Sequence, residues 1–350
     1  MPVLVDVVSQ PPPFSVDQAR AAAFARARFD GSMPHLDRLM PIFLNTGIRR
    51  RSLCQPPEWY ERDHPLDERN RAYVDAATDM CARAARTLLE RQDLEPDAID
   101  RIIYVNTTGL ATPSIDARLI NVLGLKRQIR RTPVWGLGCA GGVAGLALAV
   151  HDLLGHPRER VLLVAAEMCT LTFLHGDHSK SNLVATALFS DGAAAALLSG
   201  DDTGDSGYPI VGTRSTLFPD SLDVMGWNVV ARGLQVVFDQ RIPDIIAEHG
   251  RAEFDALLAA HDLDEADVAE FLYHPGGPKV LQAYAEAYGV SPERFCWSRR
   301  VLADHGNMSS VTVLYVLASY LAAHPHGRGG HAVVSALGPG FSSESVLMKL

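Results

Sequence analysis

The chain has 350 residues, of which 47% are hydrophobic, so it is long enough to fold around one large core or two fused ones. Its 32 basic and 41 acidic residues give a formal net charge of -9 at pH 7. This balance excludes a general attraction to nucleic acid or to an anionic membrane surface, so an anionic substrate must meet a local basic patch.

The N-terminal segment "MPVLVDVVSQPPP" lacks the basic and apolar regions of a secretory signal, and we expect it to be a loose arm. Cysteines are odd in number and widely spaced, and none forms a CxxC pair. They are Cys54, Cys81, Cys139, Cys169 and Cys296. This pattern favours reduced thiols in a cytoplasm over a disulfide framework or a zinc site.

Residues 67–91 carry apolar side chains at helical spacing, which predicts a helix, and "RIIYVNTT" at 101–108 predicts a buried strand. Strands and helices then alternate. We expect helices from 113 and from 139, and strands at 132–137, 160–167 and 192–200. Such alternation is typical of the α/β class.

One run, residues 133–150, contains 18 residues without a charge and therefore approaches the length of a membrane span. Its five glycines and its proline favour a buried strand, turn and helix instead. We therefore expect no stable membrane insertion.

The segment "GDDTGDSGYP" at 200–209 is rich in turn-forming residues and marks the best internal boundary, which divides the chain into 1–205 and 206–350. After it the pattern restarts. We expect strands at 235–238, 270–274, 331–338 and 342–350, and helices from 278 and over 309–324. Two halves of similar content suggest a duplicated unit.

Cys139 lies in "GLGCAGGVAGL", where a lone cysteine is often no more than a small buried side chain. Its position between a predicted strand and a predicted helix favours a second reading. The sulfur would sit at a helix N-terminus, which stabilises a thiolate. The flanking glycines would leave room for a substrate, and the Cys139 N–H could bind a developing oxyanion.

A thiolate nucleophile needs a base or a cationic partner, and "FLYHPGGP" supplies His274 at the end of a predicted strand. Active-site side chains of α/β proteins are often found at such strand ends, although a turn histidine that only bonds its own loop is the alternative. In "DHGNMSS", Asn307 is either the N-cap of the following helix or an amide donor aimed at a carbonyl.

Four motifs, "GLGCAGG", "HPGGP", "GNMSS" and "LGPG", occur in one order along the chain, together with "NTTG" (106–109) and "ALFSDGAAA" (187–195). In this the chain closely resembles the chalcone-synthase-like type III polyketide synthases. The resemblance implies a thiolase-like α/β fold with two duplicated halves in five αβαβα layers, assembled as a homodimer. The nucleophile would lie in the first half, and the histidine and asparagine in the second.

The resemblance also implies a catalytic triad. Cys139 would take an acyl group from acyl-CoA, while His274 and Asn307 would promote decarboxylation of malonyl-CoA and hold the enolate that attacks the thioester. Loss of CO₂ leaves charge on the thioester oxygen, so two donors are needed there and a carboxylate base is not. The CoA thioesters are substrates, and no metal or other cofactor is implied.

Further substrate contacts follow from the resemblance. Phe189 matches a phenylalanine that guards the CoA tunnel, and the family's second gatekeeping phenylalanine matches Val236. The basic lip of that tunnel matches "IRRRS", with Arg49, Arg50 and Arg51 available to CoA phosphates. An ordinary solvated face is the alternative for these arginines.

The resemblance also identifies residues of the elongation cavity and of its wall. Positions that line the cavity match Thr107, Thr108, Thr112 and Cys169, with Thr112 in place of a longer methionine. The late loop keeps Gly338, Pro339 and Gly340, but Ala336 and Leu337 replace the glycine and phenylalanine that usually precede it. Smaller side chains imply extra room.

The motifs "TTGLATPSIDARL", "EMCTLTF" and "LFPDSLDVMGWNV" resemble the bacterial branch that makes long-chain alkylpyrones and alkylresorcinols. We therefore expect a long-chain acyl-CoA starter, several decarboxylative condensations with malonyl-CoA, and ring closure. One alternative is a ketoacyl-carrier-protein synthase III, which performs a single condensation but usually has HQAN where this chain has "HPGGP". Another is a non-catalytic thiolase-fold protein that binds lipid.

Overall fold

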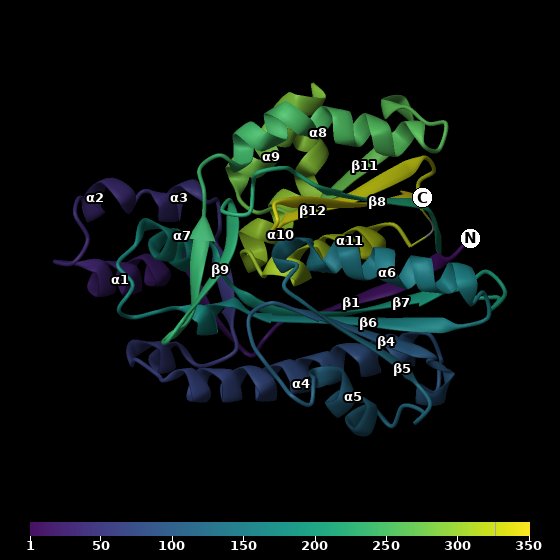
Figure 1. Cartoon of the computed structure of the whole chain (residues 1–350), viewed down its shortest axis with the longest axis horizontal. Coiled ribbons are helices and arrows are strands. Elements are labelled where there is room, and N and C mark those ends of the chain that lie inside the picture. The colour runs from purple at the N-terminus through teal and green to yellow at the C-terminus, as the bar shows by residue number, and fades with distance from the viewer. Residues whose placement is uncertain (326) are drawn as a thin grey trace.

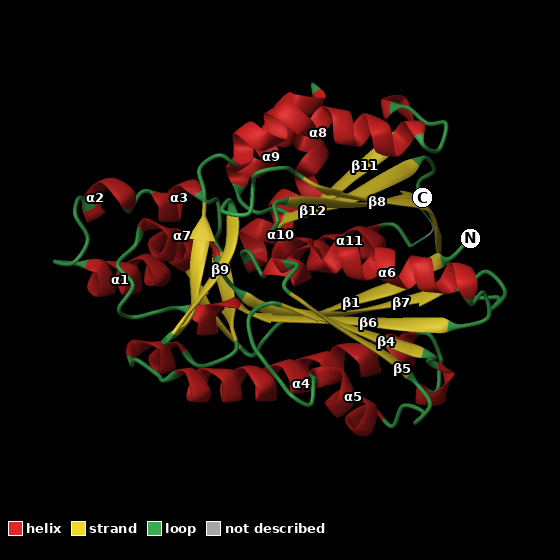
Figure 2. Ribbon diagram, viewed as in Figure 1, coloured by secondary structure: helices red, strands yellow, loops and turns green. Residues whose placement is uncertain are grey.

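The computed structural model describes residues 1–325 and 327–350 and contains five alternating layers of helices and sheets (Figures 1 and 2). Nine strands follow the order β11-β12-β13-β8-β1-β7-β6-β4-β5. β8 touches β1 only through the pairs Val3–Pro209 and Leu4–Tyr208, and at this junction the order turns from one sheet into the other. The expected thiolase-like αβαβα fold is thus observed.

Each half of the chain supplies one sheet. The first sheet consists of β1 (Val3–Gln10), β4 (Arg101–Asn106), β5 (Arg130–Trp135), β6 (Arg160–Met168) and β7 (Asp191–Ser199). The second consists of β8 (Tyr208–Leu217), β11 (Val268–Tyr273), β12 (His331–Gly338) and β13 (Ser342–Lys349). The expected boundary at 205/206 falls between β7 and β8.

Three layers of helices enclose these sheets (Figure 1). The outer layers are α4 (Leu66–Arg91) with α5 (Ile115–Leu123), and α8 (Ile242–Ala259) with α9 (Pro278–Tyr288). The central layer holds α6 (Gly141–Gly155) and α11 (Thr312–Ala323), with α10 (Cys296–His305) beside α11. Because α6 comes from the first half and α11 from the second, this layer is where the two halves meet.

The remaining elements gather beyond one end of the sheets (Figure 2). They are α1 (Gln18–Phe29), α2 (Leu36–Leu39), α3 (Ile42–Asn45), α7 (Lys180–Leu188), β2 (Phe14–Asp17), β3 (Arg50–Leu53) and the hairpin of β9 (Met225–Val230) and β10 (Gly233–Phe238). Short 3₁₀ turns adjoin them or the sheets, at η1 (Pro57–Glu61), η2 (Pro96–Ala98), η3 (Gly138–Ala140), η4 (Cys169–Thr172), η5 (Glu265–Asp267), η6 (Pro292–Phe295) and η7 (Ser309–Val311).

The N-terminal arm is not loose, so that expectation is wrong. Residues Val3–Gln10 form β1, which pairs along its length with β7 near the middle of the strand order. Leu4 and Val7 are buried between the sheets, and Val8 packs on the other face. The alternating apolar side chains of "VLVDVV" carry the strand signal.

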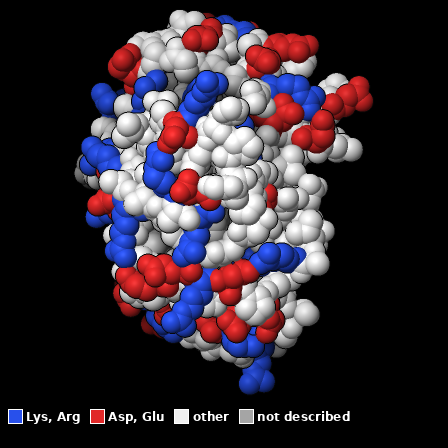
Figure 3. All heavy atoms as spheres, turned by 90° about the vertical axis from the view of Figure 1, so that its left-hand side faces the viewer, with Lys and Arg blue, Asp and Glu red and all other residues white. Residues whose placement is uncertain are grey.

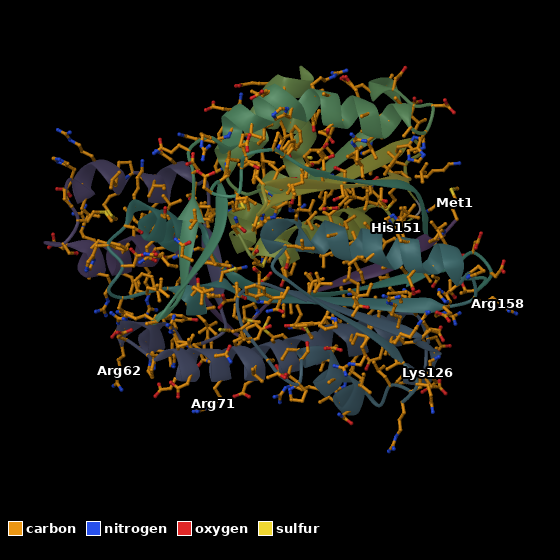
Figure 4. The ribbon with its side chains drawn as sticks, in the orientation of Figure 1. Met1, Arg62, Arg71, Lys126, His151 and Arg158 are labelled. Carbon is orange, nitrogen blue, oxygen red and sulfur yellow. The ribbon has the colours of Figure 1, made fainter. Side chains whose placement is uncertain are left out.

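The uncharged run ends in α6, as expected of a core helix. The 18-residue stretch Gly138–Gly155 is long and apolar enough to cross a membrane by length and composition, but 72% of it is buried inside the protein. Leu146 and Val150 belong to the apolar cluster between the two sheets. By contrast, Arg62, Arg71, Lys126 and Arg158 project outward at the margins of the molecule (Figure 4).

Candidate active site

Cys139 lies in the 3₁₀ turn η3, immediately before α6, and is 6% exposed. Gly138 has a φ of +48°, a conformation that favours glycine. A Cβ at Gly138 would lie 2.5 Å from the Pro339 ring, and a Cβ at Gly338 would lie 2.5 Å from the Leu137 carbonyl oxygen. The Gly-Pro-Gly loop after β12 therefore packs directly against the turn that carries the cysteine.

The glycines after Cys139 serve packing rather than substrate access. A Cβ at Gly142 would lie 2.2 Å from the Ser310 carbonyl oxygen, and one at Gly141 would lie 2.7 Å from Val105. Our expectation that these glycines leave room for a substrate is wrong, because protein atoms occupy that room. Their absence of side chains lets α6 approach η7, which brings the two halves of the site together.

A short chain of hydrogen bonds joins Cys139 to Asn307. The Cys139 thiol donates to the Ser309 hydroxyl at 3.6 Å, and the Ser309 N–H donates to Asn307 Oδ1 at 2.8 Å. Asn307 Nδ2 donates to the Gly276 carbonyl at 3.2 Å. The Oδ1 bond is of the capping kind, but it fixes the amide plane and leaves the second Nδ2 hydrogen free to donate. Asn307 can therefore act as a cap and still donate a hydrogen bond to a carbonyl.

His274 follows β11 and is 4% exposed. Its backbone N–H donates to the Ser335 carbonyl on the neighbouring strand β12, which fixes its main chain. Neither ring nitrogen has a partner among residues 1–325 and 327–350. A buried imidazole without hydrogen bonds is costly to the fold, which indicates a group reserved for a ligand.

Burial keeps both groups neutral on their own. It raises the pKa of the Cys139 thiol to about 12 and lowers the pKa of the His274 imidazole to about 3. Desolvation is the largest influence on the pKa of this thiol, and it opposes the thiolate that we expect at a helix N-terminus. A proton transfer from sulfur to imidazole would create two opposite charges together, and their attraction would offset part of that cost.

Glu167, at the end of β6, is fully buried close to this site. It accepts hydrogen bonds from the Thr107 N–H at 3.0 Å, the Thr108 hydroxyl at 2.8 Å and the Ser310 hydroxyl at 2.6 Å. Burial raises the pKa of its carboxyl to about 7, and its charge is one of the factors that raise the pKa of Cys139. Glu167 therefore ties the end of β4 to η7.

Phe189 links the two halves at the side of the site. The segment around it forms an isolated parallel bridge with Asn307, and the Asn307 N–H donates to the Leu188 carbonyl at 2.9 Å. The Phe189 ring packs in a small apolar cluster with Cys169, Ala185 and Val236. Phe189 and Val236, the two expected gatekeeping positions, therefore lie in one apolar cluster, and their gatekeeping role stays a prediction.

A cavity of about 420 Å³ begins at this cluster. Its inner wall contains Cys169, Phe189 and Val236, and its outer wall contains an Ala23–Ala27 face of α1 with Phe24. Both Ala23 and Ala27 are exposed, so the cavity opens to the surface between α1 and η1. This is an apolar channel with polar residues at intervals along its wall.

Four residues are expected to line the elongation cavity, and only one of them lines the cavity of about 420 Å³. Cys169 lines the 420 Å³ cavity. Thr107 and Thr108 are buried at the end of β4, outside that lining, and Thr112 is exposed in the single chain. Thr112 thus does not border this cavity within one chain, and its expected place in the lining of the elongation cavity stays a prediction.

The three arginines of the expected basic lip differ in their exposure to solvent. Arg49 and Arg50 are exposed, and Arg49 pairs with Asp304. Arg51 is 6% exposed, and its guanidinium donates to the Thr186 and Phe189 carbonyls at 2.5 and 2.9 Å. Arg51 therefore stabilises the segment that carries Phe189, and it also lines the 420 Å³ cavity, so its contact with CoA phosphates stays a prediction.

Sequence reasoning missed Glu167, Ser309 and Trp227. The sequence does carry a signal for Glu167. It is an acidic residue at the end of an otherwise apolar strand, which indicates a buried carboxyl group. Ser309 has a φ of +48°, which no sequence pattern announces in "NMSS". Trp227 reaches the site from the β9–β10 hairpin, a contact that depends on tertiary structure.

The model of the N-terminal domain of chalcone and stilbene synthases matches residues 47–202, and that of the C-terminal domain matches residues 210–350. The chain belongs to the chalcone and stilbene synthase family. It is 39% identical over 90% of its length to the 1,3,6,8-tetrahydroxynaphthalene synthase of Streptomyces peucetius, covering 85% of that protein. It is 29% identical to the 3,5-dihydroxyphenylacetyl-CoA synthase of Streptomyces toyocaensis, over 88% of this chain and 81% of that one.

Solved structures of type III polyketide synthases share the fold of this family member. The 1,3,6,8-tetrahydroxynaphthalene synthase of Streptomyces coelicolor superposes with a TM-score of 0.94 at 29% identity and covers 99% of both chains. CsyB complexed with CoA-SH gives a TM-score of 0.90 at 26% identity over 100% of both chains. The resemblance to the chalcone-synthase-like type III polyketide synthases is confirmed.

Proposed function

We propose that this type III polyketide synthase condenses a long-chain acyl-CoA starter with several malonyl-CoA units and closes the product to an alkylpyrone or an alkylresorcinol. We assign the cavity of about 420 Å³ beside Cys169 and Phe189 to the alkyl tail, although Phe189 matches the residue that guards the CoA tunnel and Arg20, Arg28, Arg51 and Glu61 are also in its lining; this assignment, next to the Cys139, His274 and Asn307 group, carries the proposal.

Loading begins with a proton transfer from the Cys139 sulfur to His274. The sulfur then attacks the thioester carbonyl of the starter, and CoA leaves as its thiolate, which takes the proton from His274. The pKa directions support this route, because burial disfavours either charge alone and leaves the neutral pair as the resting state. Ser309 holds the thiol before the starter arrives.

Extension uses the other two members of the group. Malonyl-CoA loses CO₂, and the electron pair of the broken bond forms an enolate whose oxygen accepts hydrogen bonds from His274 and from the free Nδ2 hydrogen of Asn307. The enolate carbon attacks the acyl group on Cys139, and the sulfur leaves as a thiolate. Each such donor is worth about 3 to 4 kcal/mol when it is aimed at developing charge.

The channel suits an alkyl tail because burial of each methylene contributes about 0.8 kcal/mol. Its opening between α1 and η1 would let a chain extend beyond the cavity. At the CoA end, Arg49 and Arg50 are the exposed arginines available to phosphates. Figure 3 shows basic and acidic side chains interleaved on this end of the molecule, with a broad uncharged area among them.

A homodimer is part of the proposal. β5 is the last strand in the sheet order of residues 1–325 and 327–350, and Trp135 at its end is 47% exposed. Leu110 is also exposed, two residues before Thr112. A second copy on this edge would cover these apolar side chains. Sedimentation analysis should give a dimer for the wild type and a monomer for Trp135→Glu, whereas a monomeric wild type would refute this part.

The deciding experiment is mass spectrometry of products formed from a panel of acyl-CoAs with labelled malonyl-CoA. Long starters should give products that carry several labelled units. A second candidate, favoured by the 39% identity to a tetrahydroxynaphthalene synthase, is a product without an alkyl tail. Malonyl-CoA supplied alone separates the two, because only the second candidate forms an aromatic product in that assay.

Two alternative functions from the sequence, a single-condensation synthase and a non-catalytic lipid-binding protein, can be tested with the same protein. A single labelled unit in every product would indicate one condensation, as in ketoacyl-carrier-protein synthase III. A non-catalytic lipid-binding protein would leave Cys139 no more reactive than Cys81, another buried thiol, toward iodoacetamide. Selective labelling of Cys139 that disappears in His274→Ala would exclude the non-catalytic reading.

A further inference from the structure

Two arginines of α1 bridge the mouth of the 420 Å³ cavity. Arg20, Phe24 and Arg28 follow one another at steps of four residues, so they lie on one face of the helix, and all three line the cavity. Arg20 donates to the Glu58 carboxylate in η1 at 2.8 Å, which balances its charge. Arg28 donates to the Glu61 backbone carbonyl at 2.6 Å, which leaves its charge unbalanced.

The Arg28 guanidinium is held in place without a counter-ion. Its Cζ lies 5.4 Å from the centre of the Phe24 ring, and its Nε is buried without a hydrogen-bond partner among residues 1–325 and 327–350. Within the same residues no carboxylate oxygen lies within 4.0 Å of its nitrogens. Glu61 is the one acidic residue in the cavity lining, and it is exposed. A fixed cation with unused donors is suited to bind an anion.

Arg51 adds a second unbalanced charge to the same lining. It is 6% exposed, its Nη1 donates to two backbone carbonyls, and no carboxylate of the described residues lies within 4.0 Å of it. Burial lowers the pKa of Arg51 only to about 10, so it stays charged at neutral pH. Asp191, whose charge acts on Arg51, accepts hydrogen bonds from Cys54 and Thr170 instead. An alkyl tail alone gives such charges no partner, so the wall indicates a ligand that carries an anion.

We propose that the cavity takes an aliphatic starter whose far end is a carboxylate, and that Arg28 binds this carboxylate at the mouth. The inference rests on the proposed function, because it places the starter tail in this cavity. The methylenes pack against the apolar part of the lining, which includes Phe24, Phe173 and Ala185, and the carboxylate accepts a charge-assisted hydrogen bond from Arg28. Such a starter is the CoA monothioester of a dicarboxylic acid, and its product keeps a carboxyl group on the tail.

The test measures kcat/KM for acylation of Cys139 by pairs of acyl-CoAs of equal chain length, one ending in a methyl group and the other in a carboxylate. A series of lengths identifies the best carboxylate starter of the wild type. In Arg28→Leu, kcat/KM for this starter should fall at least about tenfold, while that for its methyl-ended partner should change less than about twofold. Arg28→Lys keeps the charge and should stay within about threefold of the wild type.

Arg62→Leu is the matched control, because Arg62 follows η1, is exposed and points away from the body of the molecule (Figure 4). It should leave both starters within about twofold of the wild type. If Arg28→Leu does not fold, Arg28→Gln replaces it, with the same expected direction.

Equal losses for both starters in the Arg28 variant would indicate a loosened α1–η1 contact or a contact with CoA phosphates, and would overturn the proposal. Rejection of carboxylate starters at every length by the wild type would also overturn it. A free fatty acid presents the same carboxylate without a thioester, so inhibition by fatty acid without use of carboxylate starters would identify an inhibitor site instead. Selective, Arg28-dependent loading without any malonyl-extended product would refute the proposed function alone.

Discussion

Filling the channel at Cys169 should select against long starters. Cys169 is 1% exposed and lines the inner wall of the cavity, so Cys169→Phe places an aromatic ring in the path of an alkyl tail. A palmitoyl tail is about ten methylenes longer than a hexanoyl one, and each buried methylene contributes about 0.8 kcal/mol. Loss of burial for only two methylenes costs about 1.6 kcal/mol, which is about fifteenfold in kcat/KM.

The assay is kcat/KM for hexanoyl-CoA and palmitoyl-CoA with the wild type, Cys169→Phe and Cys296→Phe. Cys296 is exposed, so the control introduces the same side chain away from the cavity. We expect a loss of at least about tenfold for palmitoyl-CoA alone, the equivalent of about 1.4 kcal/mol. Equal losses for both starters would indicate damaged loading or folding, and no loss for either would place the tail elsewhere and refute the reasoning.

Three further predictions concern the catalytic group. Cys139→Ala should abolish acyl loading, measured by mass spectrometry of the intact protein, yet retain malonyl-CoA decarboxylation because His274 and Asn307 hold the enolate; an acylated variant would disprove the nucleophile assignment. Asn307→Ala should reduce decarboxylation at least about tenfold more than loading, whereas a loss of melting temperature alone, with both steps intact in Asn307→Asp, would leave only the capping role. Burial lowers the pKa of His274 from 6.5 to about 3, so its contribution to stability is complete above pH 6.5 and is lost as the pH falls toward 3. From pH 7 to pH 5 the wild type should therefore lose up to about 2 kcal/mol more than His274→Gln in urea unfolding, and identical pH profiles would show that the imidazole is solvated.

Much of the fold could be predicted from the chain order of apolar patterns. The helix expected over 67–91 is observed at Leu66–Arg91, and the strand expected over 160–167 at Arg160–Met168. These elements are long and buried, so tertiary packing reinforces the local pattern. The N-terminal segment, expected to be a loose arm, forms β1 because it pairs with β7, a strand far along the chain that leaves no local signal in this segment.

The sequence by itself determined the family and led to Cys139, His274 and Asn307 as the proposed catalytic group, because a cysteine, a strand-end histidine and an asparagine in fixed motifs are chemically unusual together. Only the tertiary structure decided what surrounds them. Burial sets the neutral state of Cys139 and His274, and it removes Arg51 from the surface although its neighbours are exposed. Trp227 meets Thr107 across 120 positions of sequence. Such contacts depend on which surfaces the layers bring together, and local pattern carries no information about desolvation or about partners distant in the chain.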